Sequence, residues 1–256
     1  MPEGLEAEIW RAAIDVTVGR TVAKAWVDER VASPGFVDAV TGVTIASVRR
    51  AGKIVLVDTD GPTIGLHFGM TGRVIVDGVA PIARLQYASD RDDPDWDRLR
   101  LFADRRDEPA IRFNDPRRLG RITLDPDVSA LGVDFASVTA TRLDTAIDGR
   151  RSAIKTVLLD QTVVAGLGNM CADEVLWWAG IDPRRPADCL DDVEVERLAT
   201  AIRRRLPAML RRGGSHRGTL SPTVRAECPP CERDGHPLRR DTIGGRTAVW
   251  CPEHQR

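Results

Sequence analysis

Residues 158–183, LLDQTVVAGLGNMCADEVLWWAGIDP, decide the fold of the second half of this chain. Two helical patterns, one ending near Gln161 and one in ADEVLWWAG, flank a turn that contains Gly166 and Gly168, and Asn169 follows near the expected N-cap. A helix N-terminus presents free N–H groups and the positive end of a dipole, so this turn could hold a phosphate. A helix–turn–helix used only for packing has the same pattern, and the spacing does not separate the two.

The sequence after this stretch predicts a long helix over about 191–211, ended by the glycines at 213–214, and then a loop over 213–227. Between residues 203 and 226 there are seven arginines and no acidic residue, which suits a polyanionic partner. A solvated helix face would have the same composition. The arginines are Arg203, Arg204, Arg205, Arg211, Arg212, Arg217 and Arg225.

The C-terminal segment has the spacing of a metal site. Cys228-x2-Cys231 is followed, after nineteen residues, by Cys251-x2-His254, and RRDTI-GG-RTAVW between them predicts a hairpin with a two-residue turn. Tetrahedral zinc takes four sulfur or nitrogen ligands, and a segment of this size has too little core to fold alone, so we expect one structural zinc ion. His236 is a rival for the fourth ligand, and a disulfide or free thiols are the alternatives to metal.

The N-terminal half has a different pattern of apolar and turn residues. Residues 3–16 have the apolar stripe of a helix, with Pro2 suited to its first turn. Short β-rich runs separated by Gly, Pro and Asp turns then fill 21–124, which is typical of an antiparallel sandwich or barrel. We therefore expect an α+β protein with three domains: a β-sandwich with a leading helix over 1–125, a helical domain over 126–222 and a zinc finger over 223–256.

Composition excludes several classes of protein. No apolar run is long enough to span a membrane, and the N-terminus lacks the pattern of a secretory signal, so a cytoplasmic location is expected. The formal net charge of −1 argues against a uniformly basic surface. Chemistry that needs a side-chain amine has three candidates, Lys24, Lys53 and Lys155.

Five blocks, in order, resemble the Fpg/Nei family, the formamidopyrimidine-DNA glycosylases and endonuclease VIII enzymes. They are MPEGLE (1–6), AGKIVLVDTDGPTIGLHFGMTGR (51–73), DPRRLGR (115–121), the stretch 158–183 quoted above, and GGRTAVWCPEHQ (244–255). This resemblance implies a helix–two-turn–helix (H2TH) domain in the middle of the chain and a zinc-finger hairpin at its end.

The resemblance also implies catalytic residues. After removal of Met1, the secondary amine of Pro2 would attack C1′ of the damaged nucleotide and form a Schiff base. Glu3 would transfer protons, with support from Glu6. Lys53 would contact a phosphate and assist elimination, although a surface lysine in a β-turn has the same setting.

The residues implied to contact DNA are spread over both halves. Asn169 and Arg246 match residues that clamp the phosphates beside the lesion, and Arg246 is also counted with the catalytic group. His67 matches a loop histidine, with a packed histidine as the alternative. The residues implied to fill the space left by a flipped base are Met70, Arg117 and Leu119, and ordinary core packing is the alternative for Met70.

Some positions depart from the family pattern. Leu5, Leu119, Cys171 and His254 replace more usual residues, and the short segment between the long helix and Cys228 favours oxidised pyrimidines as the lesion. The expected function is a bifunctional DNA glycosylase and AP lyase of base excision repair. It would act as a monomer on damaged double-stranded DNA by β,δ-elimination, without a nucleotide cofactor. The alternatives are an inactive DNA-binding member of the same scaffold and a glycosylase for bulky or cross-linked adducts.

Overall fold

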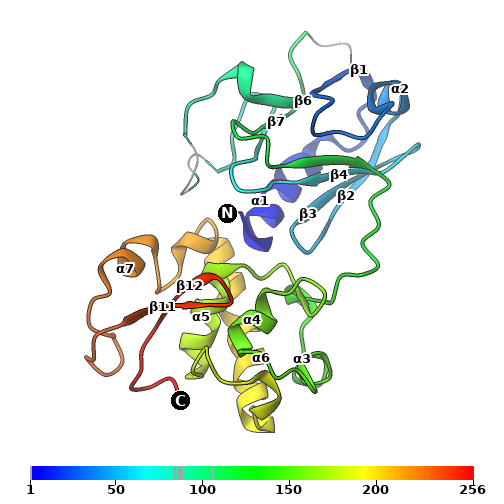
Figure 1. Ribbon diagram of the computed structural model, residues 1–256. Coiled ribbons are helices and arrows are strands. Elements are labelled where there is room, and N and C mark those ends of the chain that lie inside the picture. The colour runs from blue at the N-terminus through cyan, green and yellow to red at the C-terminus, as the bar shows by residue number, and fades with distance from the viewer. Residues whose placement is uncertain (1, 83–84, 86–88, 105–106) are drawn as a thin grey trace. The chain divides into compact units, whose positions relative to one another are not determined.

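The computed structural model describes residues 2–82, 85, 89–104 and 107–256 (Figure 1). The chain divides into two compact units, residues 1–129 and 130–256. The predicted helical and zinc-finger domains both fall in the second unit. Each unit is described by itself.

The first unit begins with helix α1 (Gly4–Ile14), whose start is fixed by a capping box. Glu3 is the N-cap; its side chain accepts the backbone N–H of Glu6, and the side chain of Glu6 accepts the backbone N–H of Glu3. Pro2 lies before the N-cap, so it is not in the first turn of the helix as the sequence predicted. The apolar face of α1 is buried at Trp10 and Ile14.

Two antiparallel four-stranded sheets form the body of this unit, which confirms the predicted sandwich. One sheet has the order β1-β6-β7-β5 and the other β2-β3-β4-β8. Helix α1 packs against β2, β3 and β5 (Figure 1). The strands are β1 (Val22–Val27), β2 (Ile45–Ala51), β3 (Ile54–Thr59), β4 (Ile64–His67), β5 (Arg73–Val76), β6 (Asp97–Ala103), β7 (Ile111–Asn114) and β8 (Arg121–Leu124), with a short helix α2 (Phe36–Val40) after β1.

The β-rich runs predicted from the sequence supply much of the core of this unit. Inward-facing residues of both sheets join the apolar side of α1 in one hydrophobic cluster, which includes Trp10, Phe68 and Phe113. The rings of Trp10 and Phe68 are 4.0 Å apart between centroids. Because Phe68 begins the FGMTG turn, this packing anchors the loop that carries Met70.

The second unit contains the predicted pair of helices around the glycine turn. Helix α4 (Ile154–Leu159) and helix α5 (Asn169–Ala179) flank a short strand β10 (Val164–Ala165), which pairs in parallel with β9 (Val133–Asp134). Helix α3 (Ala140–Ile147) and the long helix α6 (Asp192–Arg211) complete the helical part. Asp191 caps α6 through a capping box with Glu194, close to the predicted start.

The expected loop 213–227 is partly helical. Helix α7 (Pro222–Glu227) starts at the N-cap Ser221, whose side chain accepts the N–H of Val224. Strands β11 (Arg239–Ile243) and β12 (Arg246–Trp250) then form the predicted hairpin. Gly244 and Gly245 both have positive φ, +56° and +72°, as a two-residue primed turn requires.

No helix in the described part of the chain is long and apolar enough to cross a membrane.

Candidate DNA-binding and catalytic site

The backbone beside Pro2 is fixed by the first turn of α1. The N–H of Glu3 donates to Oε2 of Glu6 at 2.7 Å, and the two residues are 2% and 1% exposed. Free N–H groups and the helix dipole stabilise carboxylates at this end of a helix. Pro2 is also buried. The expected nucleophile therefore precedes a residue whose backbone is held in place by the buried carboxyl group of Glu6.

Lys53 and His67 lie near the same end of one sheet. Lys53 occupies the turn between β2 and β3, and the pairing of β3 with β4 sets Ile54 opposite His67. Partial burial of its ring lowers the pKa of His67, and the positive charges of Lys53 and Arg121 lower it further. A lowered pKa favours the neutral form of the ring, which can donate one hydrogen bond and accept another.

The three residues expected to fill the space left by a flipped base lie on two loops that are in contact. Met70 follows β4, while Arg117 and Leu119 lie between β7 and β8. A Cβ atom on Gly69 would lie 2.4 Å from the backbone carbonyl carbon and oxygen of Leu119, so only glycine fits at this contact. Arg117 is exposed, Leu119 is 41% exposed and Met70 is half-buried. The structure thus brings these three residues to one edge of the sandwich.

Asp115 ties the same two loops together through its fully buried carboxylate. Its Oδ1 accepts the hydroxyl of Thr71 at 2.5 Å, and its Oδ2 accepts the N–H groups of Leu119 and Gly120, both at 2.8 Å. Charge-assisted bonds of this kind are stronger than neutral ones. Sequence reasoning missed Asp115 as a positioning residue, although it is the first residue of the quoted DPRRLGR block.

A second carboxylate, Asp28, holds the same segment from the other side. Its Oδ2 accepts Nε of Arg118 at 3.1 Å and Nη1 of Arg98 at 3.1 Å, and Arg30 pairs with both of its oxygens. These guanidinium groups, Arg30 first, hold the pKa of Asp28 well below its usual range. Arg118 has a φ of +53°, a left-handed conformation that is unusual outside glycine. The Asp28 contacts hold Arg118 in this conformation, between Arg117 and Leu119.

In the second unit, Asn169 is the first residue of α5 and follows an extended Gly168 N-cap. The side-chain Oδ1 of Asn169 is buried and has no hydrogen-bond partner within the described ranges. Gln161 orders the preceding turn, since its Nε2 donates to the carbonyl of Leu167 at 3.0 Å and its Oε1 accepts the N–H of Gly166 at 3.0 Å. The amide of Asn169 thus lies at a helix N-terminus, the setting expected for phosphate binding.

Arg246 begins β12, and a buried ionic network fixes the residue after it. Lys155 is fully buried and forms an ion pair with Asp173 at 2.6 Å, while Arg225 contacts the other oxygen of Asp173 at 2.5 Å. Both cations also donate to the carbonyl of Thr247, at 2.6 and 3.2 Å. The exposed Arg246 therefore projects from a strand whose start is anchored to α4, α5 and α7.

A group of four possible metal ligands lies at the base of the hairpin. It consists of Cys231, Asp234, Cys251 and His254, whose ligand atoms all lie within 4.8 Å of one another. Two thiols, an imidazole and a carboxylate are donors that zinc accepts, so these residues fit the expected metal. Burial raises the pKa of the Cys251 thiol to about 11, and a bound cation would favour its thiolate.

This group differs from the predicted one. Cys228 lies outside it, with its Sγ 3.9 Å from the carbonyl oxygen of Arg225, although Cys228 packs against the same hydrophobic cluster as Cys231 and Cys251. His236 also lies outside, exposed and beside Asp234. Sequence reasoning missed Asp234 because it searched for cysteine and histidine pairs, whereas Cys231-x2-Asp234 has the same spacing as Cys251-x2-His254.

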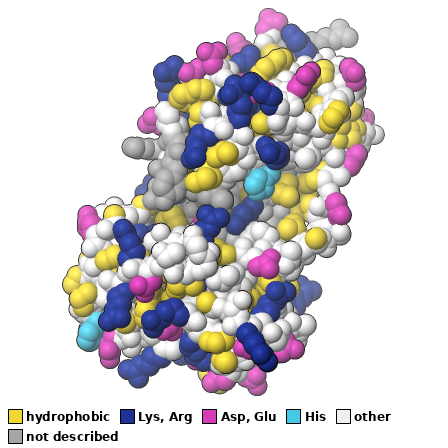
Figure 2. All heavy atoms as spheres, viewed as in Figure 1, with side chains coloured by type: hydrophobic (Ala, Val, Ile, Leu, Met, Phe, Trp, Pro, Cys, Tyr) yellow, Lys and Arg dark blue, Asp and Glu magenta, His cyan; other side chains and the backbone are white. Residues whose placement is uncertain are grey.

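The predicted basic face is only partly available to a polyanion. Of the seven arginines between 203 and 226, Arg225 is buried against Asp173, and Arg205 stacks on the ring of Trp178 with 3.1 Å from its guanidinium carbon to the ring centroid. Arg203 pairs with Glu196 at 3.0 Å. Figure 2 shows arginine and lysine side chains interspersed with acidic ones over the face in view. Binding of DNA would therefore depend on placed side chains more than on a continuous basic patch.

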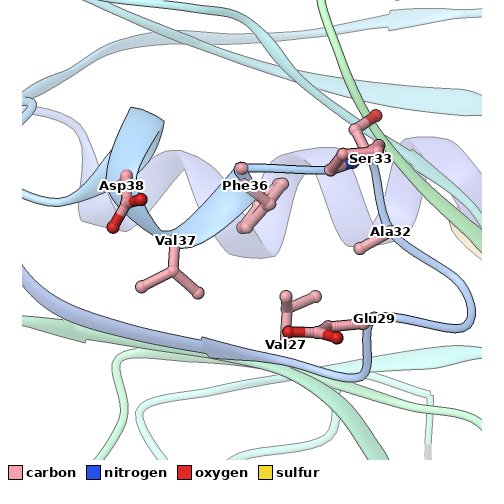
Figure 3. Close-up of a pocket in the computed structure, with 9 residues that line it drawn as sticks. Val27, Glu29, Ala32, Ser33, Phe36, Val37 and Asp38 are labelled. Carbon is pink, nitrogen blue, oxygen red and sulfur yellow. The ribbon is translucent and has the colours of Figure 1, made fainter.

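A pocket of about 560 Å³ in the first unit is lined by residues of 27–38. Figure 3 shows the apolar side chains of Phe36 and Val37 between the carboxylates of Asp38 and Glu29. Its lining contains two acidic residues and no basic one, so it repels a phosphate backbone. The pocket contains none of the expected site residues.

Comparison with known proteins finds similar sequences over most of the chain. The model of the formamidopyrimidine-DNA glycosylase N-terminal domain matches residues 1–122, and the model of the formamidopyrimidine-DNA glycosylase H2TH domain matches residues 125–220. A formamidopyrimidine-DNA glycosylase of Xanthomonas oryzae pv. oryzae is 37% identical over 84% of this chain and 83% of its own length. The enzyme of Xanthomonas campestris pv. campestris is 35% identical over the same shares.

Solved structures show the same fold. The MutM (Fpg) protein of Thermus thermophilus superposes with a TM-score of 0.81 at 26% identity, over 99% of this chain and 98% of that one. Lactococcus lactis Fpg, solved with DNA containing N7-benzyl-Fapy-dG, has a TM-score of 0.82 at 22% identity over the whole of both chains. With two family models that together cover most of its length and relatives above 30% identity, the chain belongs to the formamidopyrimidine-DNA glycosylase family.

Proposed function

We propose that this DNA glycosylase excises oxidised bases from double-stranded DNA and then cleaves the abasic strand by β,δ-elimination. The nucleophile is the Pro2 nitrogen, made available when Met1 is removed. The observation that carries the proposal is the capping box of α1, which holds the buried Glu3 directly beside Pro2. An α-amino group has a pKa of about 7.7–8.0, well below that of lysine, so a much larger fraction of it than of a lysine amine is neutral and nucleophilic near pH 7.

The chemistry follows from an imine-forming amine. The Pro2 nitrogen attacks C1′, the glycosidic bond breaks, and the base leaves with a proton. The nitrogen then loses its proton, the C1′–O4′ bond breaks and O4′ takes a proton, which leaves an iminium at C1′. The iminium acidifies the 2′ position, so loss of a 2′ proton expels the 3′ phosphate. A second elimination expels the 5′ phosphate, and hydrolysis of the imine frees Pro2.

Glu3 and Lys53 assist these steps. Glu3 is next to the nucleophile, where its carboxyl group can give and take the protons that base release and ring opening require. Glu6 keeps the backbone of Glu3 in place through its 2.7 Å hydrogen bond. Lys53 contacts a phosphate, and its charge stabilises that phosphate as it departs.

The remaining site residues bind the DNA. Asn169 and Arg246 contact the phosphates beside the lesion, and His67 contributes another polar contact. Met70, Arg117 and Leu119 occupy the space left when the damaged nucleotide leaves the stack. Support comes from the contact between their two loops, which presents all three at one edge.

The names of the relatives indicate which damaged bases to expect as substrates. Those above 30% identity are named formamidopyrimidine-DNA glycosylases, and Lactococcus lactis Fpg has been solved with DNA that contains an oxidised pyrimidine. We therefore propose oxidised purines together with oxidised pyrimidines as the substrate class. Excision from matched duplexes carrying 8-oxoguanine, formamidopyrimidine or thymine glycol decides their order of preference.

We further propose that the C-terminal hairpin holds one structural zinc ion, with Cys231, Cys251 and His254 among its ligands. The ion would crosslink the turn after α7 to the end of β12, and so stabilise the strand that carries Arg246. It takes no part in the reaction.

Borohydride trapping tests the nucleophile. An abasic duplex incubated with the protein and sodium borohydride should give a covalent adduct, and Pro2→Gly should reduce strand cleavage at least about a hundredfold while DNA binding stays close to normal. A form extended by a few residues before Pro2 is the matched control, because every side chain is retained and only the free amine is lost. An adduct of equal yield from this extended form would contradict the assignment. DNA binding without an adduct or excision from any duplex would instead favour the inactive, DNA-binding alternative.

A further inference from the structure

Two turns at the base of the C-terminal hairpin have the same backbone arrangement. In the first, the N–H of Gly235 donates to the carbonyl of Cys231 at 2.8 Å. In the second, the N–H of Gln255 donates to the carbonyl of Cys251 at 3.2 Å. Each turn therefore begins with a cysteine and closes on the residue four positions later. The fourth residue of each turn, Asp234 in the first and His254 in the second, supplies another possible metal ligand to the same group of four.

The short distances within the group of four ligands join atoms of one turn to atoms of the other. Oδ2 of Asp234 lies 3.1 Å from Sγ of Cys251 and 3.2 Å from Nδ1 of His254, and that Nδ1 lies 3.3 Å from Sγ of Cys231. Ligand atoms about 2.0–2.3 Å from a tetrahedral zinc ion are about 3.3–3.8 Å apart. Three of the six distances within this group are therefore close to those that one zinc ion would impose, and all six are within 4.8 Å.

The second oxygen of Asp234 and the second nitrogen of His254 are already engaged. Oδ1 of Asp234 accepts the N–H of His236 at 2.9 Å, which leaves Oδ2 directed at the other donors. Nε2 of His254 is 3.1 Å from the carbonyl of Trp177, so it carries the proton and Nδ1 presents its lone pair. A metal-binding histidine is commonly oriented by such a backbone carbonyl.

Cys228 has a different position. It ends α7 with a φ of +48°, and its Sγ contacts the carbonyl of Arg225 in that helix. The left-handed residue turns the chain between Cys228 and Cys231, so the two cysteines of CPPC do not form a turn like the other two. Cys231 instead forms a Cys-x2-Asp turn with Asp234.

We infer that Asp234, and not Cys228, is the fourth ligand of the metal ion, which is held by two thiolates, one imidazole and one carboxylate. This rests on the proposed metal site and assigns its ligands. Replacing a thiolate by an oxygen donor makes the site harder, so it should discriminate less strongly in favour of soft ions than a three-thiolate site would.

Cobalt(II) binding to the full-length, metal-stripped protein tests the ligand set, because thiolate-to-cobalt absorption grows with the number of thiolates. The wild type should show a tetrahedral spectrum with the intensity of two thiolates. Cys228→Ser should leave spectrum and affinity unchanged, and Asp234→Asn should weaken cobalt and zinc binding by more than about tenfold. Asp234→Cys should add a third thiolate and increase the absorption by about half.

The opposite pattern would overturn the assignment. If Cys228→Ser lowers the thiolate absorption by about a third and Asp234→Asn leaves it unchanged, then Cys228 is the ligand and Asp234 is a hydrogen-bond partner. Circular dichroism of each variant controls for folding. A wild-type protein that binds no zinc or cobalt refutes the metal site itself, whereas borohydride trapping tests the nucleophile independently, so the two failures are distinguishable.

Discussion

Asp28 in the first unit and Asp173 in the second each collect cations around one carboxylate and anchor a segment that carries an expected DNA contact. Asp28 holds the Arg118 loop, and Asp173 holds the start of β12 together with Lys155. They differ in the exposure of their partners. Arg30 and Arg118, two of the three partners of Asp28, have side chains that are 67% and 42% exposed, while Arg98 is 4% exposed. The side chains of Lys155 and Asp173 are 0% and 1% exposed.

This difference in the exposure of the partners predicts different effects on the free energy of unfolding. A buried charge that loses its partner has no water to replace it, so removing one member of a buried pair costs far more than removing an exposed one. The second unit should therefore depend on its network for folding. The first unit should use its network mainly to position a loop.

The largest effect is expected for Asp173→Asn, which leaves Lys155 and Arg225 as buried cations without a carboxylate. The second unit should lose about 3–5 kcal/mol of unfolding free energy. Urea unfolding followed by hydrogen exchange of the α5 amides measures this loss. Adding Lys155→Met to the same chain should restore part of it, and a double variant no more stable than Asp173→Asn would show that the pair is not coupled.

Asp28→Ala should cost less, about 2 kcal/mol, because Arg98 keeps its hydrogen bond to the carbonyl of Asp115 at 2.9 Å and Arg118 and Arg30 can reach water. Its larger effect should be on base opening, measured by the fluorescence of 2-aminopurine placed opposite an abasic site. Asp58→Ala, which removes a carboxylate paired with Arg49 on the other sheet, is the matched control. Equal fluorescence changes in both variants would mean that Asp28 does not position the loop.

The difference in unfolding free energy between the wild type and Asp28→Asn should depend on pH in the acid range. The pKa of Asp28 in the folded protein is lowered from its ordinary value of 3.8, so its contribution to stability is complete above that value and is lost as pH falls through the folded-state pKa. The difference in unfolding free energy between the two proteins should be constant from about pH 8 to 5 and should shrink below about pH 4. A difference that grows toward low pH would contradict the assigned ion pairs.

The smallest effect is expected for Arg30→Ala. Its guanidinium is solvated, and Asp28 keeps its bonds to Arg98 and Arg118, so the unfolding midpoint in urea should not move measurably. A shift as large as that of Asp28→Ala would remove the distinction between exposed and buried partners.

Much of the fold was predictable because its signals are local. Alternating β-rich runs, the glycine turn before Asn169 and the GG hairpin each fix a structure within a few residues. The contact between the FGMTG and DPRRLG loops followed only from the family resemblance. Nothing in either segment by itself indicates that Gly69 meets Leu119.

The unpredicted features depend on distant partners or on backbone conformation. Asp28 meets Arg118 across ninety positions and Asp173 meets Arg225 across fifty-two, and no sequence pattern reports such pairs. The basic composition around Arg225 suited either a polyanionic partner or a solvated helix face, but that arginine is buried against Asp173. The role predicted for Cys228 rested on spacing, which does not reveal that this residue takes a left-handed conformation at the end of a helix.

The close approach of Gly69 to the Leu119 backbone has a consequence for lesion search. If Met70 and Leu119 enter the duplex as proposed, this contact joins the two loops that carry them. Loops that move together would present a probe of nearly constant shape, and the local stiffness and stacking of the DNA would then decide which nucleotide leaves the stack.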